Sequence, residues 1–401
     1  MNTNMLSFDD ALATLIARAR PIREVEQVDT AISRGRVLAT ELRSPIALPG
    51  LDTSAMDGYA LRAEDVTEAG VVLPVSQRIP AGSVGHAHKP GSAARIFTGA
   101  PLPAGADTVV MQELCEAHAD QVTVNHVPRT GEAVRRAGSE VAADQPALSV
   151  GTRLGAQHIG LAASVGVAQL TVVRRMRVAL FSTGDELVMP GEPLPPGAVY
   201  NSNRFQLRVL LEQLGCEVSD FGIVPDRLEA TRKTMREAAQ GHDLILTSGG
   251  VSVGEEDHVK PAVEAEGALE MWKIAMKPGK PLAFGQVGAA AFIGLPGNPV
   301  SSFVTFLMMV RPFILATQGA SELAPRRFAL PAAFDWPRPD SRREFLRARV
   351  NAEAAVALHV NQGAAALSSI VWADGLVDVP AATAVRAGDT VHYIPYGDLL
   401  Y

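Results

Sequence analysis

The segment RMRVALFSTGDEL, from Arg175 to Leu187, decides the fold predicted for the largest part of this chain. It begins with β-branched and bulky apolar residues, which suit a buried parallel strand, and it ends in a glycine loop. The same order recurs in HDLILTSGGVSVGEED (His242 to Asp257) and in AFIGLPGNP (Ala291 to Pro299). Because ligands of open α/β sheets bind outside the carboxyl ends of the strands, the three loops predict one shared site for a phosphorylated ligand.

Helical segments alternate with these strands, as a parallel sheet requires. They are predicted in NRFQLRVLLEQLG with Asn203 as N-cap, in DRLEATRKTMREAAQG opened by Asp226, and in PVSSFVTFLMMV opened by Asn298 and Pro299. We therefore expect a central α/β domain with a parallel sheet at residues 175–319.

The remaining residues predict three further regions. Capping-box spacing at Ser7 precedes an amphipathic helix, and a second helical stretch is expected at about 28–38, so residues 1–45 with 141–174 form an N-terminal helical and linker domain. Closely spaced prolines and glycines between short extended pieces predict an inserted β-rich lid domain at 46–140. Alternating patterns and turn signals predict a C-terminal, β-barrel-like domain at 320–401.

Composition limits the classes of function. With 401 residues and a net charge of −7, the chain is a multidomain globular protein that lacks the basic surplus of nucleic-acid binders. Its longest apolar run, VSSFVTFLMMV, is too short to span a membrane and predicts a buried helix. Two distant cysteines, Cys115 and Cys216, indicate neither a disulfide framework nor a zinc site, and no leader pattern opens the chain, so we expect a cytoplasmic protein.

Three acids follow the predicted strands: Glu186, Asp226 and Asp257. Carboxylates would repel an anionic ligand unless a divalent cation lay between them, and Mg²⁺ commonly bridges protein carboxylates and phosphate. The alternative is that these acids cap the next helix or are solvated, which is the stronger interpretation for Asp226 taken alone.

Three lysines, Lys273, Lys277 and Lys280, lie within the segment WKIAMKPGKPLAFG. On one extended strand, Lys273 and Lys277 would share a face and could hold a phosphate. A lysine run is more often a solvated surface, but the apolar residues between these lysines favour a pocket wall. Gly249, Gly250 and the LPGNP loop would let backbone N–H groups approach the same anion.

The region 46–140 adds weaker signals. Asp57 lies in DTSAMDGYALR and could form only an Asx-turn, FTGAPLP could be a plain turn, and RRAGSE could be a solvated loop. His86 and His88 have chelate-like spacing, but their flanking residues favour an exposed hairpin.

Six ordered motifs, however, closely resemble the molybdopterin molybdenumtransferases, the family of MoeA and the gephyrin E-domain. They span nearly the whole chain: SAMDGYA (54–60), FTGAP (97–101), STGDEL (182–187), SGGVSVG (248–254), KPGKP (277–281) and LPGNP (295–299). The resemblance implies an elongated, cytoplasmic homodimer of molybdenum cofactor synthesis. Such an enzyme takes adenylylated molybdopterin and molybdate and, with a divalent cation such as Mg²⁺, releases AMP.

The resemblance also assigns roles to residues. Catalytic roles fall on Asp57, Thr98, Glu186, Asp226, Asp257, Lys273 and Lys277. Metal binding is implied for Glu186, Asp226, Asp257 and Glu140. Substrate binding is implied for Ser182, Thr183, Gly184, Ser248, Gly249, Gly250, Lys280, Pro296, Gly297, Asn298, Pro299 and Arg347. Because Asp57 and Thr98 lie in the inserted domain, the other subunit of the dimer is expected to complete the site.

Three residues depart from the family pattern: Glu140 replaces a common aspartate, Ala364 replaces a serine that would donate to molybdate, and His258 replaces a tyrosine.

Two alternative functions stay open, a molybdopterin adenylyltransferase and a non-catalytic, gephyrin-like scaffold. The partners implied are the adenylyltransferase and cofactor-accepting molybdoenzymes or chaperones, with no nucleic acid and no membrane.

Overall fold

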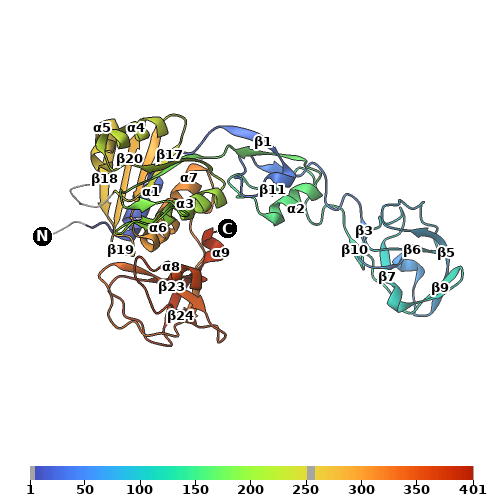
Figure 1. The fold of residues 1–401 in the computed structure, drawn as a ribbon. Helices are drawn as coiled ribbons and strands as arrows, with labels where there is room; N and C mark the ends of the chain where they lie inside the picture. The colour runs from blue at the N-terminus through green and yellow to red at the C-terminus, as the bar shows by residue number, and fades with distance from the viewer. Residues whose placement is uncertain (1–4, 251–257, 401) are drawn as a thin grey trace.

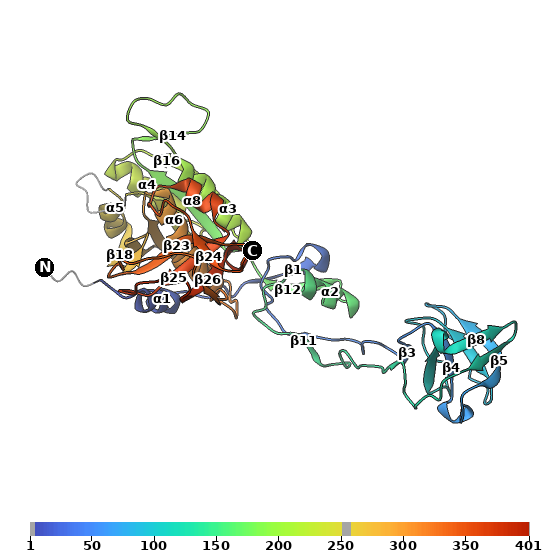
Figure 2. The same ribbon diagram turned by 90° about the horizontal axis from the view of Figure 1, so that it is seen from below.

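The computed structural model describes residues 5–250 and 258–400. The protein is elongated (Figure 1). An α/β body and a C-terminal β module lie together at one end, and a separate β module, here called the distal module (residues 53–135), lies at the other. A narrow connector of paired strands joins them (Figure 2).

The α/β body is built on a six-stranded sheet. Its order is β16 (Glu217–Val224), β13 (Arg177–Thr183), β17 (Leu244–Ser248), β21 (Ala290–Leu295), β20 (Pro281–Val287) and β18 (Gly267–Lys273). The first four strands are parallel, as predicted, but β20 and β18 are antiparallel. The sheet is therefore mixed, because the short turn at Gly288 can join β20 to β21 only as a hairpin.

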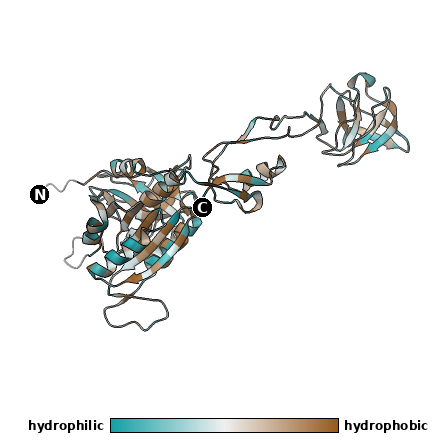
Figure 3. Cartoon of the chain, turned by 90° about the horizontal axis from the view of Figure 1, so that it is seen from above, coloured by the Kyte–Doolittle hydropathy of each residue, from teal (hydrophilic) through white to brown (hydrophobic). Residues whose placement is uncertain are grey.

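Helices cover both faces of this sheet. Helices α1 (Phe8–Ala17), α3 (Ser202–Gln213), α6 (Pro299–Thr305) and α7 (Arg311–Thr317) pack on the face formed by Val178, Leu180 and Leu246. Helices α4 (Leu228–Ala238) and α5 (Val259–Glu266) pack on the other, with Phe181 and Ile245. Burial on both faces explains why these strands read as continuous apolar runs, which Figure 3 shows in brown.

The helix from Pro299 to Thr317 is long and apolar enough to cross a membrane, but 94% of its apolar window is buried inside the protein. It runs through α6, a π-helical turn at Phe306–Val310 and α7. The sequence predicted a buried helix here, and the prediction is confirmed.

The helix starts test the capping predictions. Ser7 caps α1 by accepting from the N–H of Asp10 at 3.1 Å, and Asn298 precedes Pro299 at the start of α6, both as predicted. The prediction for α3 was wrong, because Asn201 is its N-cap and Asn203 donates instead to the carbonyl of Gly297. Arg227, not Asp226, occupies the N-cap position of α4, so the predicted start of this helix was one residue too early.

The second helix expected at 28–38 is absent from the described residues of that segment. The chain forms β1 (Val25–Asp29) and a 3₁₀ turn, Thr30–Ile32. Strand β1 pairs antiparallel with β12 (Gln169–Val173), which follows α2 (Ala156–Ser164). Pairing between segments about 140 residues apart overrides the local helical pattern, and it joins the two ends of the insertion.

Two further strand pairs carry the chain outward and back. β2 (Leu42–Arg43) pairs with β11 (Pro146–Leu148), and β3 (Thr53–Ser54) pairs with β10 (Val134–Arg135). The distal module then holds a six-stranded sheet in the order β7 (Thr108–Met111), β4 (Gly58–Leu61), β6 (Ala93–Ile96), β5 (Val71–Ile79), β9 (Gln121–Val124) and β8 (Cys115–His118).

The C-terminal module is a second mixed sheet. Its order is β19 (Met276–Lys277), β23 (Arg343–Val350), β25 (Gly375–Val379), β26 (Thr390–Pro395) and β22 (Phe328–Pro331), with β24 (Val356–Leu358) beside β23. Helices α8 (Leu367–Trp372) and α9 (Tyr396–Leu400) complete it. Strand β19 belongs to the α/β segment of the chain but pairs with β23. This pairing attaches the C-terminal module to the α/β body beside the predicted site.

Candidate active site at the carboxyl edge of the sheet

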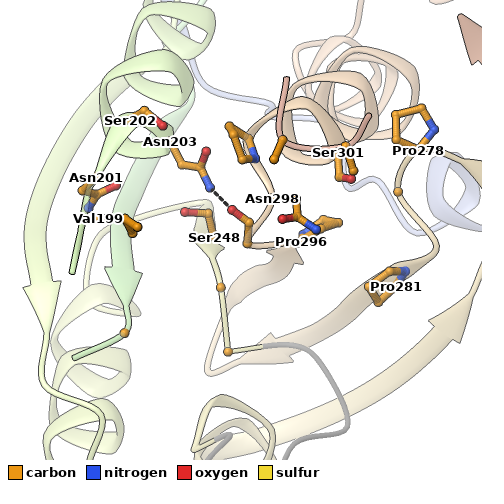
Figure 4. Close-up of a pocket in the computed structure, with 18 of the residues that line it drawn as sticks. Val199, Asn201, Ser202, Asn203, Ser248, Pro278, Pro281, Pro296, Asn298 and Ser301 are labelled. Atoms are coloured by element: carbon orange, nitrogen blue, oxygen red, sulfur yellow. Dashed lines mark hydrogen bonds between the residues drawn. The ribbon is translucent and has the colours of Figure 1, made fainter. Parts of the chain in front are cut away.

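A cavity of about 1000 Å³ opens where β13, β17 and β21 end (Figure 4). The loops after these strands form one side, and β14 (Leu187–Val188) with β15 (Val199–Tyr200) extends it. The C-terminal module closes the opposite side with Arg342 and residues 362–365. The three glycine loops that the sequence singled out therefore share one cavity.

Close backbone contact shapes the floor. Gly249 has φ +89°, and a Cβ there would lie 2.8 Å from the carbonyl oxygen of Thr183 at the end of the neighbouring strand. Gly279 has φ +107°, and a Cβ there would lie 2.1 Å from Oγ1 of Thr305. Only glycine fits at either position, since both the conformation and the space exclude a side chain. The cavity wall is consequently made of main chain at these points.

Buried polar side chains line the same floor. The amide of Asn203 donates to the carbonyl of Gly297 at 2.7 Å and joins α3 to the LPGNP loop (Figure 4). Oγ1 of Thr183, Nδ2 of Asn201 and Oδ1 of Asn203 are buried and have no hydrogen-bond partner among the described residues. Buried polar atoms are normally paired, so these three groups are suited to a polar ligand or to water.

Two of the four predicted metal ligands line this cavity. Glu186 and Asp226 do so, while Asp257 lies outside the described residues. Glu140 is exposed on the connector, where its N–H donates to the carbonyl of Leu48, and it does not line the cavity. Within the described residues, no group of three or more His, Cys, Asp or Glu side chains could hold a metal ion.

The three predicted lysines do not all lie at the cavity. Lys277 and Lys280 line the cavity, but Lys273 is exposed at the end of β18 and does not. The expectation that Lys273 and Lys277 share one strand face was wrong. The chain turns between them, because the backbone of Leu6 pairs on either side of Ile274, and Lys277 enters the other sheet.

Lys277 is held by two carboxylates of the C-terminal module. Its Nζ lies 3.0 Å from Oε1 of Glu344 and 3.3 Å from Oδ2 of Asp340. Burial lowers the pKa of Lys277, but hydrogen bonds and charge attraction from Glu344 and Asp340 outweigh it, and the net shift is upward. Glu344 is only 1% exposed and also accepts from the indole N–H of Trp336 at 2.8 Å. A fixed, protonated lysine therefore faces the cavity.

Arg342 was missed by the sequence reasoning. It lines the cavity, and its guanidinium forms a two-pronged hydrogen bond with Asp340, at 2.9 Å on each side. That hydrogen bond is the main reason why its pKa is raised. The usable signal was its place two residues before Glu344, the one acid in β23, which also carries three arginines.

Arg347, predicted to bind substrate, does not line the cavity. It is fully buried, and its guanidinium donates to Oγ of Ser369 at 3.1 Å and to the carbonyl of Gly363 at 3.3 Å. Burial lowers its pKa to about 10. Its hydrogen bond to Gly363 makes it a support for residues 362–365, which do line the cavity.

That loop contributes main chain as well as side chains. Gln362 exchanges hydrogen bonds with the backbone of Arg347 at 2.9 Å in both directions. The carbonyl of Ala364 accepts from the N–H of Val300 at 3.0 Å, at the start of α6.

Most of the other predicted binding residues also line the cavity. They are Thr183, Gly184, Ser248, Gly249, Gly250, Pro296, Gly297, Asn298 and Pro299. Ser182 does not line it, and its buried hydroxyl lies 3.5 Å from that of Ser248.

Asp57 and Thr98 lie in the distal module, far along the molecule from this cavity (Figures 1 and 2). They touch each other, since Oδ1 of Asp57 accepts from the N–H of Thr98 at 2.8 Å and from its hydroxyl at 2.7 Å. The hydrogen bond from the backbone of Thr98, followed by the hydrogen bond from its hydroxyl, lowers the pKa of Asp57.

The two histidines of the distal module differ in exposure. His86 is exposed, but His88 is buried at 7% exposure, so the exposed-hairpin prediction was wrong for His88.

Comparisons with known proteins agree along the whole chain. Residues 6–166 match the MoeA N-terminal region (domain I and II), 179–316 a probable molybdopterin binding domain, and 329–396 the MoeA C-terminal region (domain IV). The molybdopterin molybdenumtransferase of Haemophilus influenzae is 37% identical over 99% of this chain and all of its own length. The chain belongs to the molybdopterin molybdenumtransferase family.

Other relatives fit the same assignment to the transferase family. The molybdopterin molybdenumtransferase of Nostoc is 40% identical over 82% of this chain and 78% of its own length. The crystal structure of the molybdopterin biosynthesis MoeA protein from Pyrococcus horikoshii matches with a TM-score of 0.83 at 26% identity, covering 98% of this chain and all of that one. This family fold accounts for the four-part, elongated architecture.

The first prediction for this transferase concerns its glycine floor. Gly249→Ala should destabilise the protein by on the order of 1–3 kcal/mol, because it adds backbone strain and a clash with Thr183. Gly241→Ala is the matched control, since Gly241 has a similar φ of +82° with no atom within 4 Å of its Cβ. Equal denaturation midpoints for the two variants would show that close contact at Gly249 is unimportant.

The second prediction concerns the support of Lys277. Glu344→Gln should lower the pKa of Lys277, because the opposing charge is lost while the burial remains. The chain has only six lysines, so reductive ¹³C-methylation and NMR titration can follow each one. Exposed Glu353→Gln, in the same module, is the control. An unchanged titration of Lys277 would mean that Glu344 does not set its charge.

Proposed function

We propose that this protein inserts molybdate into adenylylated molybdopterin and releases AMP, the last step of molybdenum cofactor synthesis. Its family membership and its full-length match to named molybdopterin molybdenumtransferases support this assignment. The observation that carries it is that Lys277, Lys280 and Arg342 line one cavity of about 1000 Å³ together with Glu186 and Asp226. Such a cavity has the size and the charges for a nucleotide-linked pterin.

The cationic wall fits the chemistry. Cleavage of a phosphoanhydride spreads negative charge over phosphate oxygens, and positioned lysine and arginine groups stabilise that charge. Lys277 and Arg342 are both fixed by Asp340, so they require little reorganisation when charge develops. The buried polar atoms of Thr183, Asn201 and Asn203 are suited to orienting the ligand on the cavity floor.

A divalent cation such as Mg²⁺ fits the acids present. Mg²⁺ is usually held by one or two carboxylates together with substrate phosphates and water, and Glu186 and Asp226 line the same cavity. We propose these two residues as its protein ligands. The cation would supply charge neutralisation at the phosphates, which allows the acids to face an anionic substrate.

The active form is proposed to be a homodimer with composite sites. Asp57 and Thr98 form a preorganised pair, yet they lie on a module held away from the cavity of their own chain. A second copy could bring its distal module to this cavity.

The cellular location is proposed to be the cytoplasm. There, upstream adenylyltransferases would supply the substrate, and cofactor-accepting enzymes or chaperones would take the product.

The C-terminal module argues against the two alternatives. A small adenylyltransferase would need only the α/β body, whereas here Arg342 and residues 362–365 of the C-terminal module complete the cavity. Gephyrin of Dictyostelium discoideum is also a relative, 30% identical over 77% of this chain and 49% of its own length. The charged cavity wall favours catalysis over scaffolding alone.

The third prediction tests the chemistry. Purified protein with adenylylated molybdopterin, molybdate and Mg²⁺ should release AMP, measured by chromatography. Lys277→Ala and Asp57→Asn should each reduce this rate by about 100-fold or more, since each removes a charged group from the reacting centre. Asp57→Asn should keep a thermal midpoint within a few degrees of wild type, because that position is only partly buried. Lys277→Ala leaves the buried carboxylate of Glu344 without its cation, so its activity is measured well below its own lowered midpoint. A fully active Lys277→Ala protein would refute the assignment.

The fourth prediction tests the composite site. A differently tagged heterodimer of Asp57→Asn and Lys277→Ala subunits should recover about half of wild-type activity, because both lesions fall in one site and the other site is intact. The matched control pairs Lys277→Ala with Glu186→Gln, two changes in the same cavity, and should not recover activity. Equal inactivity of both heterodimers would show that each chain uses its own distal module.

A further inference from the structure

The distal module carries a cationic stack that the reaction scheme above leaves unused. Strands β5 and β6 are parallel neighbours, and Arg78 is paired in register with Arg95. Both guanidiniums lie over the ring of Phe97, at 4.6 Å for Arg78 and 4.7 Å for Arg95 from the ring centroid. The aromatic side chain thus contacts two positive charges.

Arg95 is fixed by further contacts. Its guanidinium donates to Oε1 of Gln112 at 2.7 Å and to the carbonyl of Gly58 at 3.2 Å. It also lies over the ring of Tyr59, 5.2 Å from the centroid. Arg78, in contrast, is exposed. One guanidinium is therefore rigid, and the other is accessible to a ligand.

Among the described residues, the stack has no ion-pair partner, although the charge of Arg95 acts on Asp57 at longer range. Two other arginines of the module and its connector are ion-paired, Arg62 with Asp65 and Arg136 with Asp52. Neither Arg78 nor Arg95 forms an ion pair with a carboxylate among the described residues, although neighbouring like charges repel each other. The exposed guanidinium of Arg78 is therefore suited to a bidentate oxyanion.

The stack borders the Asp57–Thr98 pair. Thr98 directly follows Phe97, and Asp57 directly precedes Gly58, whose carbonyl binds Arg95. Asp57 also accepts both of its hydrogen bonds from Thr98. After the two hydrogen bonds from Thr98, the charge of Arg95 also lowers the pKa of Asp57, so a ligand held by Asp57 and Thr98 would lie within reach of that charge.

We propose that the Arg78–Phe97–Arg95 stack is an oxyanion subsite of the distal module. This inference rests on the proposed function: when the module closes over the cavity of a second copy, the subsite binds a tetrahedral oxyanion of a substrate. Arg78 makes the direct contact, and Arg95 with Phe97 positions it. Both the phosphate of the nucleotide-linked pterin and molybdate have this chemistry.

The kinetic test compares Arg78→Gln, Arg78→Lys and wild type, with KM measured separately for adenylylated molybdopterin and for molybdate. Arg78→Gln should raise one KM by about 10-fold, as expected for a lost charged hydrogen bond, with kcat changed by about 2-fold or less. A rise for the pterin identifies the phosphate, and a rise for molybdate identifies that anion. Arg78→Lys should recover part of the loss, because it keeps the charge.

Lys89→Gln is the matched control, because it removes one exposed cation from the same module. It should leave both KM values unchanged. If Arg78→Gln also leaves both unchanged, the subsite does not exist. If Lys89→Gln raises the same KM equally, the effect is only the net charge of the module, and the proposal also fails.

A binding experiment separates this inference from the proposed function. Inorganic pyrophosphate is titrated calorimetrically into Lys277→Ala protein, which weakens phosphate binding at the cavity, and into the same protein carrying Arg78→Gln or Phe97→Leu, each first checked for folding by circular dichroism. Affinity should fall by about 10-fold in Arg78→Gln and by a smaller factor in Phe97→Leu, which keeps both charges. Unchanged affinity in both variants overturns the subsite even if AMP is released, whereas weakened binding without AMP release would refute only the reaction.

Discussion

Close approach of main chain at the carboxyl edge of the parallel strands is the constraint on which the rest of the site depends. Gly249 lies against the carbonyl of Thr183, and Gly279 lies against Thr305 of α6. Larger residues at these points would force the strand ends and the lysine loop apart. The cavity, the reach of Lys277 and the contact with the C-terminal module all follow from that packing.

The parts of this arrangement that depend on local sequence could be predicted. Apolar runs ending in glycine correctly identified β13, β17 and β21, because strands buried on both faces must be apolar throughout. The shared edge followed from the rule for parallel sheets, and Glu186, Asp226 and Lys277 do line one cavity there. The caps of α1 and α6 were also predictable, since a cap depends on a few adjacent residues.

The parts that depend on distant pairing could not be predicted in the same way. The local sequence predicted that Lys273 and Lys277 lie on one strand. Instead, Leu6 pairs with Ile274 between them, and Lys277 pairs with β23 of the other sheet. Arg342 lines the cavity because it directly precedes β23, which pairs with β19, and no local pattern reveals that pairing. Arg347 matched a functional position by resemblance, yet β23 is buried on both faces there, and Arg347 lies beneath the loop that it supports.

The two ends of the molecule show complementary forms of preorganisation. At the cavity, Asp340 and Glu344 fix cations that face an anionic ligand. On the distal module, Thr98 fixes the carboxylate of Asp57 while Phe97 and Gln112 fix Arg95. Two connector strand pairs hold these groups apart within one chain, so neither set can complete the other intramolecularly in this arrangement. In a lone chain, the cavity and the distal module would each face solvent. A competent site would therefore form only when two copies assemble, so activity would depend on oligomerisation.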